Sequence, residues 1–194
     1  VLSMILVFPN SMVNAEKPID ITEEKALVDA LLGEEAIYNE DAITRGEYVL
    51  LMAKLTKTLF EGETENAFLD VEPNSRYSAA ISSALSQGWI SRSENFEPDR
   101  AITPNEAIKI AVCVIGREIE ANQKGGYPYG YLSVAISQGM TKGWNTGADT
   151  LSGEAFYKLA FAMMRAELLS GSLLTNGEIS EFENSSSTLL RKIY

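Results

Sequence analysis

Arg45 is the residue from which a chemical role can be argued, and it lies in the segment DAITRGEYVLLMAKL at 41–55. Thr44 and Glu47 have the spacing of a capping box, in which each of the two residues accepts a hydrogen bond from the other's backbone N–H. This spacing predicts a helix that begins after Thr44 and carries Arg45 in its first turn. The guanidinium of Arg45 is then either a solvated surface group or a cation that binds a ligand, and the segment alone leaves both interpretations open.

Side chains that commonly carry catalysis are scarce. The chain has no histidine and one cysteine, Cys113, which lies in the aliphatic stretch AVCVIG and is expected to be a buried, inert thiol. No glycine-rich phosphate loop, nucleophile elbow or metal-ligand spacing occurs in the sequence. A carboxylate pair of the glycosidase type is conceivable, but the acids within motifs are explained by capping or solvation. We therefore expect a protein that is not an enzyme and uses no metal or cofactor.

Composition narrows the classes of partner. The chain has 194 residues, of which 45% are hydrophobic, enough for a sizeable packed core. Its 16 lysines and arginines stand against 27 acids, which gives a net charge of -11. Such a chain is poorly suited to phosphate backbones or to the anionic face of a bilayer. We expect no nucleic-acid partner and no membrane insertion, although a local cationic site for an acidic ligand is compatible with this charge.

The capped segment recurs along the chain. AIT at 42–44 returns at 101–103, and a weaker form, TLS, occurs at 150–152. Counting 4, 7, 8 and 11 residues onward from each cap always reaches a nonpolar or aromatic side chain, as expected on one face of a helix. These positions are Tyr48, Leu51, Met52 and Leu55, then Ala107, Ile110, Ala111 and Val114, then Phe156, Leu159, Ala160 and Met163. Three equivalent amphipathic helices are therefore predicted.

An earlier helix is expected before each capped one, and it ends at or near a glycine: Gly33, Gly88 or Gly139. Its inward-facing residues are expected to be Leu27, Val28, Leu31 and Leu32, then Ala80, Ile81, Ala84 and Leu85, then Tyr131, Leu132, Ala135 and Ile136. The predicted fold class is mainly α, with three helix-loop-helix repeats that share one core in a pseudo-three-fold bundle with three grooves. The repeats are expected at 16–60, 61–120 and 121–168.

The start of the sequence differs from the repeats. Residues 1–15 are apolar at first and then small and polar, and Val13 and Ala15 suit the positions before a signal-peptidase cut. We interpret 1–15 as a signal peptide remnant and expect a secreted protein. A short buried strand or helix is the alternative interpretation.

The tail at 169–194 also leaves the repeat pattern. Its stretch SLLTNGEISEF is centred on Asn176-Gly177, which predicts a short β-hairpin with a two-residue turn. The following TLLRKIY, at 188–194, is a candidate third strand. A lone hairpin is only marginally stable in water, so the tail is expected to dock on the bundle or to begin a further domain.

The middle repeat, FLDVEPNSRYSAAISSALSQGWISRSENFEPDRAITPNEA, resembles the S-layer homology domain. It shares with that family's repeat an F-x-D-V start, an aromatic and an isoleucine in the first helix, a Gly-Ile turn, an F-x-P segment and the opening of the last helix. The matching residues are Phe68, Asp70, Val71, Tyr77, Ile81, Gly88, Ile90, Phe96, Pro98, Ile102, Thr103 and Glu106. The resemblance covers roughly residues 20–167 and is weakest in the third repeat.

This resemblance implies a three-pronged, non-catalytic module that anchors an exported protein to secondary polysaccharide of the bacterial cell wall. In that family the ligand carries pyruvylated sugars, and the arginine of an I-T-R-A-E motif lines the groove with an aspartate, a glycine turn and aromatic residues. Only the first copy keeps this arginine, as Arg45, because Pro104 and Gly153 replace it in the others. The implied ligand-binding residues are Arg45, Asp70, Trp89 and Trp144.

Less specific interpretations accompany each of these residues. Asp70 is also suited to holding a turn, and Trp89 and Trp144 to covering the edges of the core. The tyrosines of GGYPYGY at 125–131 either form a platform for sugars or pack a turn. The alternative function is a degenerate scaffold that serves as a spacer or binds another protein. The groove beside Arg45 distinguishes the two, because an anchor needs it open and cationic, whereas a spacer would have it filled by side chains.

Overall fold

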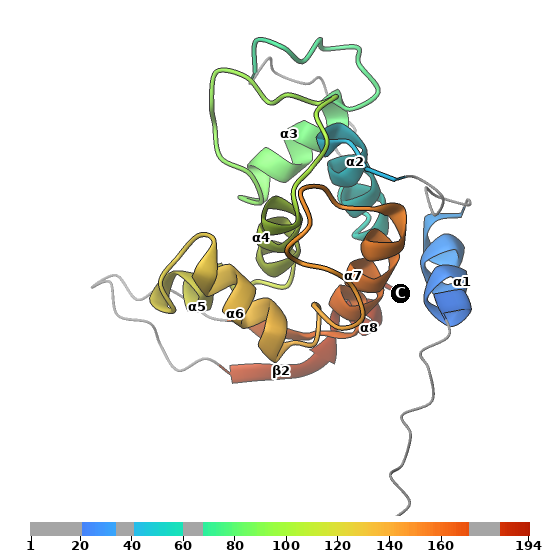
Figure 1. Cartoon of the computed structure of the whole chain (residues 1–194), viewed down its shortest axis with the longest axis vertical. Helices are drawn as coiled ribbons and strands as arrows, with labels where there is room; N and C mark the ends of the chain where they lie inside the picture. Colours follow the sequence, from blue (N-terminus) through green and yellow to red (C-terminus); the bar gives the residue numbers. More distant parts are fainter. Residues whose placement is uncertain (1–20, 34–40, 60–67, 171–182) are drawn as a thin grey trace, which may run out of the picture.

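The computed structural model describes residues 21–33, 41–59, 68–170 and 183–194 and is mainly α-helical, as predicted (Figure 1). The helices are α1 (Ile21–Leu32), α2 (Arg45–Leu55), α3 (Ser78–Ser86), α4 (Pro104–Val114), α5 (Glu118–Gln123), α6 (Tyr129–Ser137), α7 (Gly153–Arg165) and α8 (Leu189–Ile193). The strands are β1 (Glu167–Ser170) and β2 (Glu183–Thr188). The expected signal peptide at 1–15 lies outside the described residues. Within the described ranges, no helix is both long and apolar enough to cross a membrane.

Three helices begin at the predicted caps. Thr44 and Thr103 form complete capping boxes with Glu47 and Glu106, at the starts of α2 and α4. In each box the hydroxyl accepts from a backbone N–H three residues on, and the carboxylate accepts from the N–H of the cap. Ser152 caps α7 through its hydroxyl alone, which accepts from the N–H of Ala155 at 3.2 Å, because alanine stands where the two boxes have glutamate. Local sequence therefore fixes where these three helices start.

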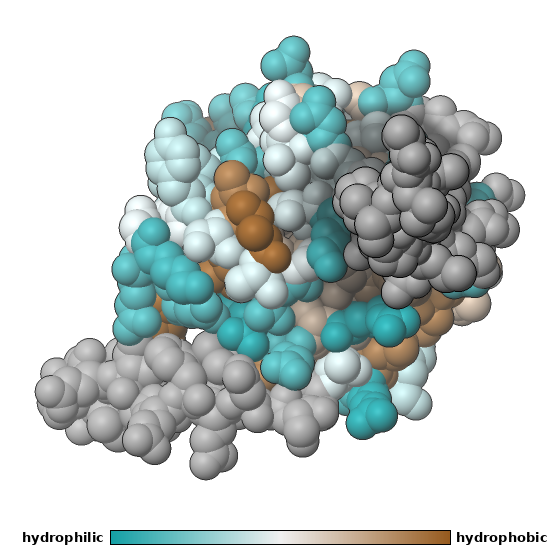
Figure 2. Space-filling view, turned by 60° about the horizontal axis from the view of Figure 1, so that its bottom comes forward, coloured by the Kyte–Doolittle hydropathy of each residue, from teal (hydrophilic) through white to brown (hydrophobic). Residues whose placement is uncertain are grey.

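Each capped helix buries its predicted face. Every position on the three faces is buried except Val114, which is partly buried. The three faces meet about one helical turn after each cap. There the Tyr48 hydroxyl donates to the carbonyl of Ala107 at 2.9 Å, and the Tyr48 ring lies edge-on to Phe156, at 6.1 Å between centroids. On the face of the molecule shown in Figure 2, hydrophobic residues are exposed mainly in separate areas, with polar residues between them.

A closed ring of backbone hydrogen bonds joins the residues just before the three caps. The N–H of Ile43 donates to the carbonyl of Leu151, that of Leu151 to Ile102, and that of Ile102 back to Ile43. Each of these bonds is 2.9 Å long, and all three side chains are fully buried. The ring therefore ties together the starts of α2, α4 and α7, the helices nearest the middle of Figure 1.

The remaining long helices surround this centre in a cyclic order. α3 packs on α2, α6 packs on α4, and α1 packs on α7. Each capped helix thus pairs with the first helix of the next predicted repeat, with the last one closing onto α1. Figure 1 shows α1, α3 and α6 on three different sides of the central helices. The spacing of apolar residues in the sequence predicted these helices, but it did not indicate which of them pack together.

Two details of the third helix pair differ from the prediction. Ile136 was expected to face inward, but it is 59% exposed, and Val134 is fully buried in the same helix. The face of α6 is therefore rotated relative to the alignment with the other repeats. The short helix α5, whose Ala121 is buried, was not predicted and packs on α6.

The described part of the tail forms an antiparallel pair of strands. Leu169 pairs with Asn184 and Ser170 with Glu183, which is the register that a two-residue turn at Asn176-Gly177 requires. That turn itself lies outside the described residues. The strand β2 lies just beyond the stretch SLLTNGEISEF on which the hairpin had been predicted.

The prediction of a third strand at 188–194 was wrong. Thr188 instead caps the short helix α8 by accepting from the N–H of Arg191, because a threonine with nonpolar residues after it also suits a helix start. The hydroxyl of Tyr194 lies 3.3 Å from the carbonyls of both Leu31 and Leu55, at the ends of α1 and α2. This part of the tail packs on the helical body.

Candidate ligand-binding site

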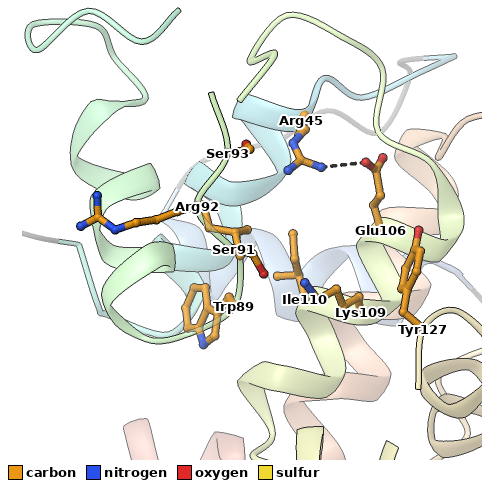
Figure 3. Close-up of a pocket in the computed structure, with 10 residues that line it drawn as sticks. Arg45, Trp89, Ser91, Arg92, Ser93, Glu106, Lys109, Ile110 and Tyr127 are labelled. Carbon is orange, nitrogen blue, oxygen red and sulfur yellow. Dashed lines mark hydrogen bonds and ion pairs between the residues drawn. The ribbon is translucent and has the colours of Figure 1, made fainter. Parts of the chain in front are cut away.

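A cavity of about 400 Å³ opens between the start of α2, the turn that follows α3, and α4. Its lining combines cationic side chains and serines with aromatic and isoleucine side chains (Figure 3). The lining residues are Arg45, Trp89, Ile90, Ser91, Arg92, Ser93, Glu106, Lys109, Ile110 and Tyr127. Two of the four predicted ligand-binding residues, Arg45 and Trp89, therefore lie in one cavity, although they are distant in sequence.

Arg45 is held in place on several sides. Its Nη1 donates to Glu106 at 2.7 Å, and its Cζ lies 4.6 Å from the centre of the Phe96 ring. Only 18% of the side chain is exposed, so it is not the freely solvated group that the sequence allowed. Its Nε is buried and has no hydrogen-bond partner. A buried guanidinium N–H without a partner carries a desolvation cost, which a bound acceptor can offset.

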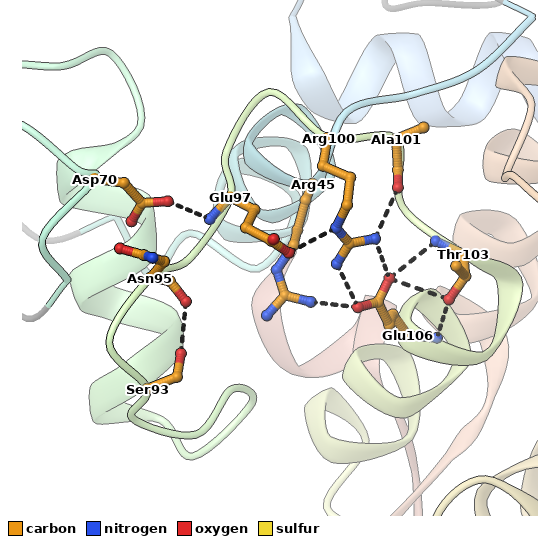
Figure 4. Close-up of polar contacts among 9 residues, drawn as sticks. All are labelled: Arg45, Asp70, Ser93, Asn95, Glu97, Arg100, Ala101, Thr103 and Glu106. Carbon is orange, nitrogen blue, oxygen red and sulfur yellow. Dashed lines mark hydrogen bonds and ion pairs between the residues drawn. The ribbon is translucent and has the colours of Figure 1, made fainter.

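Glu106 is the acceptor for two arginines and for its own cap (Figure 4). Its Oε1 accepts from Arg45 and from Arg100 at 2.7 Å each, and its Oε2 accepts from Arg100 and from the N–H and hydroxyl of Thr103. Partial burial raises the pKa of Glu106, but the Arg100 hydrogen bonds, the Thr103 backbone bond and the two guanidinium charges together lower it to about 2. Glu106 is therefore ionised at any physiological pH.

Asp70 does not line the cavity. Its carboxylate accepts from the backbone N–H groups of Phe96 and Glu97, at 2.7 and 2.6 Å. These bonds hold the loop that places the Phe96 ring against Arg45. Asp70 therefore has a structural role, but it holds the loop at Phe96 and Glu97 and not the turn at its own position that the sequence suggested.

The two tryptophans are placed differently. Trp89 lines the cavity, but only 4% of it is exposed, so it presents little surface for stacking. Trp144 donates from Nε1 to the carbonyl of Met140 at 2.8 Å and packs against the core, away from this cavity. The structure thus separates Trp144 and Asp70 from Arg45.

Eight of the ten lining residues were not among the predicted site residues, and three of these eight carry an aromatic or a cationic side chain. Tyr127 is 52% exposed and offers the cavity an aromatic side chain, and its ring also lies edge-on to that of Tyr131, at 6.3 Å between centroids. Arg92 and Lys109 are cationic, although Figure 3 shows the Arg92 guanidinium pointing away from Arg45 and Glu106. Arg92 was visible in the sequence only as a departure from the glycine turn, and Lys109 is an ordinary position two turns into a helix.

A second cavity, of about 390 Å³, lies between α1, the turn after α6, and α7. It contains Glu24, Lys142, Lys158, Phe161 and Arg165 among its lining residues. None of the residues that line it belongs to the first turn of a capped helix, so this cavity has no counterpart of Arg45.

The described residues offer little for other chemistry. No cluster of three or more histidine, cysteine, aspartate or glutamate side chains that could hold a metal ion occurs among them. Burial raises the pKa of the Cys113 thiol to about 12, so this thiol is protonated at neutral pH. What the first cavity can do chemically is bind an anion next to an aromatic side chain.

Comparison of the chain with protein-family models and with curated proteins finds no match.

Proposed function

We propose that this chain is a three-repeat module of the S-layer homology type, and that it binds a carboxylate-bearing glycan of the cell wall in the cavity beside Arg45. The observation that carries the proposal is the Arg45 side chain itself, which lines an open cavity and retains a buried Nε without a partner. Among the other lining residues, Arg92 and Lys109 are cationic and only Glu106 is anionic. An excess of positive charge in a chain with a net charge of -11 favours an acidic ligand at this place.

The arrangement of the helices supports the three-repeat part of the proposal. Three caps, a closed hydrogen-bond ring among Ile43, Ile102 and Leu151, and a cyclic pairing of inner with outer helices are each expected of a pseudo-three-fold bundle. In such a bundle the cavity beside Arg45 is one of the grooves between neighbouring repeats.

The residues of the cavity suit separate parts of such a ligand. Arg45 would hold the carboxylate through charge-assisted hydrogen bonds, next to the positive end of the α2 dipole. Tyr127 would contact the apolar face of a sugar ring, and Ser91 and Ser93 would reach its hydroxyl groups. The partner is then secondary cell-wall polysaccharide, and the place of action is the cell surface of the organism that exports the protein.

The competing proposal is a degenerate scaffold that spaces or binds other proteins. The loss of the arginine at Pro104 and Gly153 favours it, because two of the three helix starts have no cation there. The bond from Arg45 to Glu106 also favours it, since this bond uses one of the donors that a ligand would need.

A sedimentation assay with purified cell-wall sacculi tests the two proposals. The wild-type protein is expected to pellet with intact sacculi and to remain soluble when the secondary polymers have been stripped from them. Arg45→Ala is expected to weaken binding about tenfold or more, as the loss of a charged hydrogen-bond donor does. Arg191→Ala, which removes the same charge from the exposed surface of α8, is the matched control and should bind normally. Absence of binding to intact sacculi of several wall types would exclude the anchor and leave the scaffold.

A further inference from the structure

Two arginines share one carboxylate beside the cavity, and only one of them lines it. Arg45 faces the cavity and gives Glu106 one hydrogen bond, from Nη1. Arg100 is not among the lining residues and gives Glu106 two, from Nη2 at 2.7 Å and Nη1 at 3.1 Å (Figure 4). Arg100 comes from the loop before α4, three residues ahead of the cap Thr103.

Arg100 changes how the charge of Glu106 is balanced. Glu106 carries one negative charge, and without Arg100 it would be neutralised by Arg45 alone. A ligand carboxylate would then have to displace Glu106 from Arg45 and leave a half-buried anion without its partner, which is costly. With Arg100 present, a second guanidinium balances Glu106, so Glu106 stays paired when Arg45 turns to a ligand. Arg100 is also paired with Glu97, and the four side chains together carry no net charge.

The hydrogen bonds lead to the same conclusion. If Arg45 turned to a ligand, Oε1 of Glu106 would still accept from Arg100, and Oε2 would still accept from Arg100 and Thr103. Arg100 is itself fixed, because its Nε donates to Glu97 at 2.8 Å and its Nη1 also donates to the carbonyl of Ala101. Glu106 therefore keeps its partners whichever way Arg45 points.

The loop that carries Arg100 is also attached to the start of α2. The backbone N–H of Arg45 donates to the carbonyl of Arg100, and that of Gly46 donates to Pro98, each at 2.8 Å. The position of Arg100 relative to Arg45 is thus set by main-chain bonds and does not depend on side-chain contacts alone.

We propose that Arg100 is a positioning residue that keeps Glu106 occupied, so that the Arg45 guanidinium is available to the carboxylate of a ligand in the cavity. This inference rests on the proposed function of the same cavity. Arg100 acts through Glu106 and does not touch the ligand. This positioning role is specific to the middle repeat, because the residues three places before the other two caps are aspartates, Asp41 and Asp149.

A double-mutant cycle tests the inference with a monosaccharide that carries a pyruvate ketal as the probe, its affinity being measured by calorimetry. Arg100→Gln is expected to weaken binding about tenfold, because Glu106 then competes with the probe for Arg45. Glu106→Gln keeps the capping box, since glutamine also serves at that position, and is expected to bind at least as well as the wild type. The double variant should return to within about threefold of the wild type, because its Arg45 has no competing carboxylate.

Two results would overturn the inference. If Arg100→Gln binds as the wild type does, Arg100 has no positioning role. If the double variant remains as weak as Arg100→Gln, Arg100 acts on the ligand or on the shape of the cavity instead of acting through Glu106.

A measurement without ligand separates this inference from the proposed function. The unfolding equilibrium constant is measured for Arg45→Ala, Glu106→Gln and the double variant, and the coupling is the factor by which their effects fail to multiply. It should be about twofold in the wild-type background. It should be about tenfold in Arg100→Gln, where Arg45 is the remaining guanidinium beside Glu106. Unchanged coupling would refute the positioning role even if the probe binds. Increased coupling without any binding of the probe would refute only the proposed glycan site.

Discussion

At the scale of single residues, two shielded carboxyl groups differ in how their oxygens are satisfied. Glu106 is surrounded by donors from Arg45, Arg100 and Thr103. Glu24 is only 6% exposed, and its Oε2 is buried without a hydrogen-bond partner. Burial without partners destabilises the charged form, whereas donors stabilise it. The two groups therefore make opposite contributions to the pH dependence of stability.

Glu106 should make the protein sensitive to acid. Its pKa is lowered from 4.5 to about 2 in the folded state, so its stabilising contribution is complete above about 4.5 and is lost as the pH falls through about 2. The wild type should lose on the order of 2 kcal/mol more unfolding free energy than Glu106→Gln between these two pH values. Urea unfolding at pH 4.5, 3 and 2 measures the difference. Parallel losses in the two proteins would contradict the role given to this carboxylate.

Glu24 should have the opposite effect on stability, and lower it as the pH rises. Burial raises its pKa, the charge of Lys158 lowers it, and Glu154 raises it again, with a net increase. A raised carboxyl pKa stabilises the fold below the unfolded-state pKa, and this contribution is lost as the pH rises through the folded-state value. Glu24→Gln should therefore raise the unfolding free energy at pH 7 by about 1 kcal/mol, with a smaller gain at pH 4. Glu23→Gln, at the exposed neighbouring position, should change it by less than about 0.5 kcal/mol at either pH. A loss of stability in Glu24→Gln at pH 7 would show that its carboxylate is needed.

At the scale of the elements, the features that could be predicted from the sequence are those that depend on residues within about one helical turn of each other. Capping boxes at Thr44 and Thr103 involve residues three apart, and the buried faces follow from helical periodicity. The pairing of α3 with α2 could not be predicted in this way, because it depends on which apolar faces meet after collapse. The cavity follows from that pairing, so the sequence alone gave no indication that Tyr127 would face Arg45. The rotated face of α6, which exposes Ile136, has the same origin.

The contact between α2 and α3 gives a prediction whose sign opposes helix propensity. Replacing a helical glycine by alanine ordinarily stabilises a helix by about 1 kcal/mol. A Cβ on Gly46 would lie 2.8 Å from Cδ2 of Tyr77, whose ring is 8% exposed and has little room to move. Gly46→Ala should therefore lower the unfolding free energy by about 1 to 3 kcal/mol in thermal or urea unfolding.

Two control variants identify the cause of that loss. Gly147→Ala, where the nearest atom is 3.5 Å away, should leave the stability nearly unchanged. In a Tyr77→Ala background, Gly46→Ala should become neutral or stabilising, because the ring is no longer there. If the loss persists without the ring, the close approach of α2 and α3 is not its cause.

At the scale of the whole molecule, the helices are interlocked. Each outer helix lies on a central helix that the hydrogen-bond ring joins to the other two. Tyr194 adds a connection near the ends of α1 and α2. No predicted repeat can open by itself without breaking the ring and exposing the helix of a neighbour. The helical body should consequently unfold as one cooperative unit.

Leu151→Ala tests that cooperativity, because Leu151 is fully buried and belongs to the ring. The truncation should lower the unfolding free energy by about 2 to 5 kcal/mol, as in other well-packed cores. Native-state hydrogen exchange should then show reduced protection in α2, α4 and α7 together, although only α7 is close to Leu151 in the sequence. Leu69→Ala, at a position that is 81% exposed, removes the same atoms and should leave protection unchanged. Reduced protection in α7 with α2 and α4 unaffected would mean that the predicted repeats are separate folding units, and that the ring is a contact between them without energetic coupling.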